Sequence, residues 1–99
     1  MHNDKFYDVL NQRAVVLRDK IMFLEKYIEL IPELRIKTSI ERNIERYYYK
    51  RNYTDNYKYI SDKNEIHKLL VIYYAKKAVV PLKRELSHIN RILAGNIDK

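Results

Sequence analysis

Apolar residues recur every seven positions near the start of the chain, in two interleaved series. One series is Tyr7, Ala14, Ile21 and Ile28, and the other is Leu10, Leu17, Leu24 and Ile31. A heptad repeat of this kind is typical of a helix that packs along its length against another helix. The pattern predicts a long helix over about residues 4–30.

A third apolar series lies on the same stretch. Its members are Val9, Val16, Phe23 and Leu30. With this series the apolar arc becomes wider than a two-stranded coiled coil requires. We therefore expect the first helix to contact two other helices, from its own chain or from neighbouring chains.

A second heptad pattern occupies the C-terminal third of the chain. It consists of Ile72, Val79, Leu86 and Leu93, interleaved with Ala75, Leu82 and Ile89. Asp62, with Glu65 three residues later, is a capping pair that opens a helix, and Gly95 suits its end. The pattern predicts a helix over about residues 62–94. Because the register is the same on both sides of Pro81, we expect one helix kinked there rather than two helices.

The middle of the chain also sorts into two faces when it is placed on a helix at about 100° per residue. Apolar side chains fall on one side, namely Ile36, Ile40, Ile44 and Tyr47. Pro32 fits the first turn of such a helix. We therefore predict a second helix over about residues 33–52 and a loop before the last helix. The expected fold is all-α, a single domain over residues 1–99 with three long helices in a coiled-coil-like bundle.

Composition narrows the possible chemistry. The only glycine is Gly95, so a glycine-rich phosphate loop and the nucleotide-binding folds built on one are excluded. The chain has no cysteine, which excludes disulfides, thiolate chemistry and cysteine-ligated zinc. A net charge of +7 favours an anionic partner. There is no signal-peptide pattern and no apolar run that could span a bilayer, so we expect a cytoplasmic location in a bacterial or infected host cell. A basic amphipathic helix could bind an acidic membrane surface, but the heptad seams suit helix packing better and the chain has no tryptophan, so we expect no membrane partner.

Catalytic patterns are missing as well. No histidine has another histidine or a carboxylate at helical metal-ligand spacing, so no metal site and no cofactor are expected. The serines have no evident partner that would activate a nucleophile. Arg84 and His88 resemble the pairs of small helical ribonucleases, but their spacing is one residue short. We expect a protein that is not an enzyme.

Basic and aromatic residues gather opposite the apolar side of the predicted middle helix. Phosphates attract lysine and arginine, and exposed tyrosine rings can stack on bases. A second basic line follows the last helix at intervals of seven residues. The predicted nucleic-acid contacts are Arg35, Arg42, Arg46, Tyr49, Lys50, Tyr53, Lys77, Arg84 and Arg91, with Tyr57 as a further stacking candidate. The hypothesis requires the guanidinium groups of Arg42 and Arg46 to avoid the interior and carboxylates of their own chain.

Two stretches resemble parts of the UvsY-type recombination mediators of tailed phages. They are Ile44-Glu45-Arg46-Tyr47-Tyr48-Tyr49-Lys50 and Lys68-Leu69-Leu70-Val71-Ile72-Tyr73-Tyr74 leading to Arg91. The resemblance covers roughly residues 20–95 and departs at Lys50 and Arg51, where the family has a glycine. It implies a helical homo-oligomer that binds single-stranded DNA and helps to load a recombinase.

The same residues are also compatible with a protein-binding role or with no binding role. Tyrosine and arginine are favoured at protein interfaces, so the chain could be an interaction module such as a phage-encoded inhibitor, assembly factor or minor structural protein. Alternatively, an AT-rich genome would enrich tyrosine, lysine, asparagine and isoleucine without any selection for binding. The oligomer number, the preference for DNA or RNA, and the identity of a protein partner do not follow from the sequence.

Overall fold

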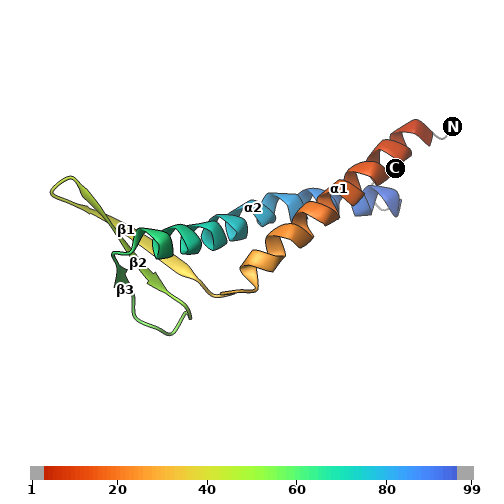
Figure 1. Ribbon diagram of the computed structural model, residues 1–99. Coiled ribbons are helices and arrows are strands. Elements are labelled where there is room, and N and C mark those ends of the chain that lie inside the picture. Colours follow the sequence, from red (N-terminus) through yellow and green to blue (C-terminus); the bar gives the residue numbers. More distant parts are fainter. Residues whose placement is uncertain (1–3, 96–99) are drawn as a thin grey trace.

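The computed structural model describes residues 4–95 and contains two long helices and a small antiparallel sheet (Figure 1). In chain order the elements are α1 (Asp4–Ile28), β1 (Arg35–Glu41), β2 (Ile44–Lys50), β3 (Lys58–Ile60) and α2 (Lys63–Leu93). The two helices run side by side in opposite directions, and the sheet lies where α1 ends and α2 begins (Figure 1). The predicted all-α bundle of three helices is therefore wrong, because the fold is mixed α and β.

The two predicted heptad seams pack against each other along the helical part. Members of both are buried, including Ala14, Leu17 and Ile21 of α1 and Ile72, Ala75, Val79 and Ile89 of α2. Ala14, Leu17 and Ile89 form one core cluster with half-buried leucines from both helices around them. This packing keeps the molecule long and narrow, with extents of 64 × 25 × 24 Å.

The ends of α2 agree with the prediction. Asp62 caps the helix, since its Oδ1 accepts hydrogen bonds from the backbone N–H groups of Asn64 (2.8 Å) and Glu65 (3.4 Å). After the helix, Gly95 has a positive φ of 78°. The helix passes through Pro81 as a single element of 31 residues. α1 ends at Ile28, two residues before the predicted position.

Residues 33–52 form a β-hairpin instead of the predicted helix. Strands β1 and β2 pair antiparallel from Arg35 opposite Lys50 to Glu41 opposite Ile44. Between them Arg42 and Asn43 have positive φ values of 52° and 65°, as the two central residues of a type I′ turn do. β1 contains two isoleucines and a threonine, and β2 contains an isoleucine and three tyrosines, all of which favour extended backbone. These preferences outweigh a spacing that also suits a helix.

One face of the sheet packs on the helices and completes a second core cluster. Ile36, Tyr49 and Ile60 lie on this face because they pair across the sheet or stand two residues from a paired position. They contact buried residues from the α1–β1 connection and from the first turns of α2, namely Ile31, Leu34, Leu69 and Ile72. The opposite face of the sheet is left without a covering element in the described chain.

The third apolar series of α1 remains exposed. Val9 is 60%, Phe23 59% and Leu30 67% accessible to solvent. In the described chain α1 packs mainly on α2, so the expected second helical neighbour is not supplied by residues 4–95. Neither described helix has the length and apolar character needed to cross a bilayer.

Candidate nucleic-acid interface

Strand alternation places basic and aromatic side chains together on the uncovered face of the sheet. Opposite partners share a face, so Arg35 lies beside Lys50, Lys37 beside Tyr48, and Tyr48 beside Tyr59. Arg46 is two residues from Tyr48 and projects to the same side. We call this surface the outer face. It comprises Arg35, Lys37, Arg46, Tyr48, Lys50 and Tyr59, together with Tyr53 and Tyr57 from the following loop.

The loop between β2 and β3 folds back toward the outer face. The Lys50 Nζ donates a hydrogen bond of 3.0 Å to the carbonyl oxygen of Tyr53. The Tyr57 ring lies between two ammonium groups, 5.0 Å from the Nζ of Lys50 and 5.4 Å from the Nζ of Lys37. Such distances allow cation–π attraction, which holds the ring over the strands. Tyr57 therefore adds a ring to the outer face beside β1 and β2.

Rings and cations alternate across the outer face. The Tyr48 and Tyr59 ring centres are 5.7 Å apart with an interplanar angle of 56°. The guanidinium carbon of Arg46 lies 5.8 Å from the centre of the Tyr59 ring, and the Nζ of Lys37 lies 6.0 Å from that of Tyr48. Tyr59 remains 52% exposed. The face thus offers aromatic surface with positive charge at its margins.

Glu41 reduces the charge of the outer face at one end. Its Oε2 lies 3.3 Å from the Nε of Arg46, within ion-pair distance. The same Nε is buried and makes no hydrogen bond of acceptable geometry, so we regard the pair as a charge contact rather than a hydrogen bond. The requirement that Arg46 avoid carboxylates of its own chain is therefore not met. In residues 4–95 no carboxylate lies within ion-pair distance of Arg35, Lys37 or Lys50.

A groove joins the outer face to α2. It has a volume of about 310 Å³ and is lined by Leu34, Arg35, Tyr53, Tyr73, Lys76, Lys77 and Val80. The guanidinium carbon of Arg35 is 4.8 Å from the centre of the Tyr53 ring, and the Nζ of Lys77 is 4.5 Å from that of Tyr73. Interaction with the Tyr73 hydroxyl raises the pKa of Lys77 above its ordinary value. Three predicted contacts, Arg35, Tyr53 and Lys77, thus meet in one place.

Lys76, in the same groove, holds the connection between α1 and β1 in place. Its Nζ donates hydrogen bonds to the carbonyl oxygens of Pro32 (2.6 Å) and Leu34 (3.2 Å). These bonds fasten the connection that leads from α1 into β1. Lys76 thereby fixes the position of Arg35, while Lys77 stays available to a ligand.

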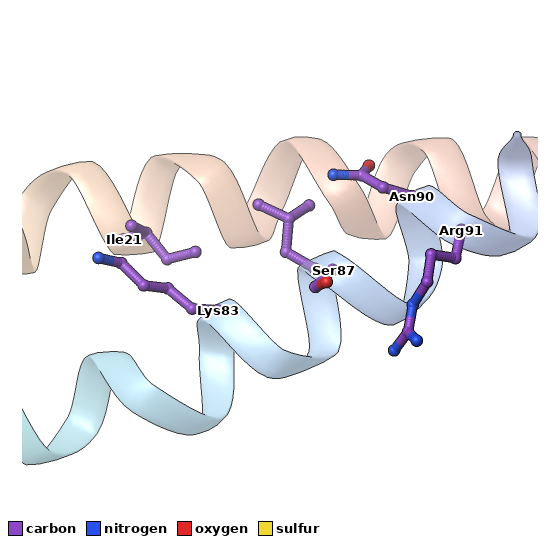
Figure 2. A pocket seen from close by; sticks show the side chains of 6 residues that line it. Ile21, Lys83, Ser87, Asn90 and Arg91 are labelled. Atoms are coloured by element: carbon purple, nitrogen blue, oxygen red, sulfur yellow. The ribbon is translucent and has the colours of Figure 1, made fainter.

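The other predicted contacts are distributed over different surfaces. Tyr49 lies on the helix-facing side of the sheet and packs against the core, so its assignment to the basic face is wrong. Arg42 is exposed at the tip of the hairpin. Arg84 and Arg91 are exposed on the second half of α2. Arg91 borders a shallow groove between the helices and points away from α1 (Figure 2). At 1.5 Å per residue it lies about 21 Å along the helix from Lys77.

Three members of the outer face, Lys37, Tyr48 and Tyr59, are not among the contacts predicted from the sequence. A helical wheel places Lys37 and Tyr48 roughly 140° to 160° around the axis from Arg35 and Lys50, and Tyr59 lies outside the predicted helix. A period of two groups Lys37 with Arg35 and Tyr48 with Lys50, and the turn at residues 42–43 brings the two groups to one face. Tyr59 belongs to a strand of three residues, which is too short to show a period.

Within residues 4–95 no group of three or more histidine, aspartate or glutamate side chains is placed to hold a metal ion. Comparison with protein families, curated proteins and solved structures finds no match for this chain.

Proposed function

We propose that the protein binds single-stranded nucleic acid on the outer face of its sheet, as an accessory factor without catalytic activity. The observation that carries the proposal is the alternation of Lys37, Lys50 and Arg35 with the rings of Tyr48 and Tyr59 on one uncovered surface. Lysine and arginine attract the phosphate backbone, and aromatic rings provide platforms for bases. A surface that combines both suits a strand whose bases are accessible.

A single strand fits this surface better than a duplex does. In a duplex the bases are stacked on one another, so exposed rings such as Tyr57 and Tyr59 would find no base face to contact. The outer face also lacks a helix that could enter a major groove. We expect little preference for sequence, because every base offers an aromatic face to a stacked tyrosine.

A bound strand would run from the outer face into the groove beside Lys77. It continues the outer face from Arg35 and Tyr53 to Tyr73 on α2. A backbone lying across β2 and β1 would reach the ammonium group of Lys77 next. Arg46, which already pairs with Glu41, contributes less than Arg35, Lys37 or Lys50 in this arrangement.

The resemblance to UvsY-type mediators stays a prediction. Its tyrosine segment, residues 44–50, lies on strand β2 and not on a helix. A recombinase as partner, and the loading of that recombinase onto DNA, also remain predictions. An interaction module for another protein is the second candidate function, and the exposed apolar residues of α1 favour it.

Fluorescence anisotropy with a labelled oligothymidine of about 30 nucleotides tests the proposal. Tyr59→Ala should weaken binding roughly 5- to 150-fold, because a stacked ring contributes about 1 to 3 kcal/mol per base, whereas Tyr59→Phe should retain most of the affinity. Tyr74→Ala is the matched control, since Tyr74 is a comparably exposed tyrosine on α2. The proposal fails if Tyr59→Ala and Tyr74→Ala bind alike, or if a duplex of equal length binds as tightly as the single strand.

A further inference from the structure

One side of α1 carries large apolar side chains that nothing in the described chain covers. Val9, Val16, Phe23 and Leu30 are 42–67% exposed and follow one another at intervals of seven residues. Tyr27 lies on the same side, four residues after Phe23. We call these five residues the α1 stripe. It runs along nearly the whole helix and reaches Leu30 just past its end, about 120° around the axis from the seam that packs on α2.

The extent of the stripe indicates an interface. Its exposed fractions correspond to on the order of 500 Å² of surface per chain, against the roughly 800 Å² per partner of a standard protein interface. The polar side chains beside it would add the remainder on contact. An exposed apolar area of this size is at the upper end of what monomers expose, and Arg13 and Lys20 interrupt it. Its sevenfold spacing matches a second helix over the full length of α1, whereas a loop or a small molecule would cover only a part.

We propose that the α1 stripe packs against the same stripe of a second copy of this chain, with the two α1 helices antiparallel. A heptad has two core positions, a and d. Val9, Val16 and Phe23 occupy position d, and Arg13, Lys20 and Tyr27, four residues after each of them, occupy position a. A parallel pair in register would place Lys20 against Lys20, and would place Arg13, which pairs with Glu85 of its own chain, against a second Arg13. An antiparallel pair separates these like charges, because core positions of the two kinds then alternate.

The antiparallel register that uses the whole stripe is defined by its layers. Val9 would face Tyr27 of the partner subunit, and Val16 would face Lys20 of the partner subunit. In the second layer the methylene stem of lysine covers the valine while its ammonium group reaches solvent. The stripe continues at Leu30 into an apolar groove of about 480 Å³, which Tyr27, Ile31 and Val71 also line. The beginning of the partner's α1 would enter this groove.

The antiparallel dimer leaves the outer face of each sheet accessible. The dimer proposal does not rest on the proposed function. The sheet lies at one end of each chain (Figure 1). Antiparallel pairing through α1 therefore places the two sheets at opposite ends of the dimer and leaves both outer faces uncovered. The outer face and the α1 stripe lie on different elements, so either can be altered alone.

Light scattering across a concentration series tests the pairing. The parent chain should show the mass of two copies. Phe23→Glu should raise the dissociation constant of the dimer by at least about 100-fold. Met22→Glu is the matched control, because Met22 is 58% and Phe23 59% exposed on the same helix. Met22 points about 100° away from Phe23 around the helix axis. Circular dichroism shows whether both variants keep their helices. A single-copy mass for the parent, or a dimer that withstands Phe23→Glu, overturns the proposal.

The absence of cysteine from the chain makes the orientation measurable. A mixture of Val9→Cys and Tyr27→Cys chains should form a mixed disulfide dimer under mild oxidation. Phe23→Cys alone should not form a disulfide dimer, because in this antiparallel register Phe23 does not face Phe23 of the partner subunit. A dominant Phe23→Cys homodimer overturns the antiparallel arrangement. Oligonucleotide binding by Phe23→Glu, measured in parallel, separates a failure of pairing from a failure of the proposed function.

Discussion

Arg13 of α1 and Glu85 of α2 form a two-point ion pair across the helical hairpin, although 72 residues separate them in sequence. The Arg13 Nε donates to the Glu85 Oε2 at 2.6 Å, and the Nη2 donates to the Oε1 at 3.0 Å. These hydrogen bonds lower the pKa of Glu85 below its ordinary value. The apolar seams alone would tolerate a shift of one helix along the other, so this pair helps to fix their register.

The Glu85 carboxylate should make stability depend on pH. A pKa that is lowered in the folded state gives stabilisation that is present above the ordinary glutamate value of about 4.3 and is lost as the pH falls through the lower folded value. Glu85→Gln should therefore unfold at lower urea concentration than the parent at neutral pH, and the difference should shrink in acid. Glu29→Gln, at an exposed glutamate, serves as control. Equal differences at neutral and acidic pH would contradict the prediction.

The salt dependence of binding should identify the phosphate contacts. Each contact to a single strand contributes about −0.7 to the slope of log affinity against log salt. The double variant Lys37→Gln/Lys50→Gln should therefore show a slope shallower by about 1.4 than that of the parent. Arg91→Gln should leave the slope unchanged, because Arg91 lies far along α2. If Arg91→Gln alters the slope as much as the double variant does, the contacts follow α2 and not the sheet.

The hairpin turn should be improvable at Arg42. Its φ of 52° lies in the left-handed region, which costs most L residues about 1 to 2 kcal/mol. Asparagine adopts this conformation more easily and is favoured in type I′ turns, so Arg42→Asn should raise the free energy of unfolding by about 0.5 kcal/mol. Arg42→Val should lower it by about 1 kcal/mol or more. Urea unfolding measures both, and a stabilising effect of valine would exclude the turn geometry described above.

The contact between the helices should depend strongly on Leu17. This side chain is fully buried in the cluster with Ala14 and Ile89. Leu17→Ala should lower the free energy of unfolding by about 2 to 5 kcal/mol, because it removes buried methyl groups and leaves a cavity. Val15→Ala, two residues away and 53% exposed, should change it by less than about 0.5 kcal/mol. Similar losses for the two variants in thermal or urea unfolding would contradict this packing.

The helical half of the fold was readable from the sequence because its signals agree with one another. The sevenfold series of α1 and α2 recur over three or more turns, and Asp62 and Gly95 mark the ends of α2 as caps do. Repetition over so many residues leaves one interpretation. Even Pro81, which normally ends a helix, did not obscure it, because the apolar register continues on both sides.

The hairpin escaped prediction because its spacing is ambiguous. Ile36 and Ile40 are four residues apart, which places them on one face of a helix and also on one face of a strand. The decisive residues were Arg42 and Asn43, whose positive φ values turn the chain without glycine. Asparagine is known in this conformation, but arginine is uncommon there. A turn built without glycine therefore left no clear signal in the sequence.

The grouping of part of the candidate site was predicted correctly from the sequence, although the structural reason is strand pairing and not the predicted helical face. Arg35, Lys50 and Tyr53 do lie on one side of the chain, yet strand pairing and a loop place them there and not a helical face. Lys77 joins them only through the packing of α2 beside β1. Contacts between elements distant in sequence leave no local period, so the meeting of Lys77 with Arg35 could not be read from the sequence.

The division of the core into two clusters has a consequence for internal motion. Leu17 and Ile89 belong to the cluster between the helices, whereas Leu34 and Ile60 belong to the one beneath the sheet. Each cluster can lose its packing while the other persists, so the two ends of the molecule can open as separate cooperative units. Backbone amides of the hairpin should then exchange their hydrogens with deuterated water well before those in the middle of α1.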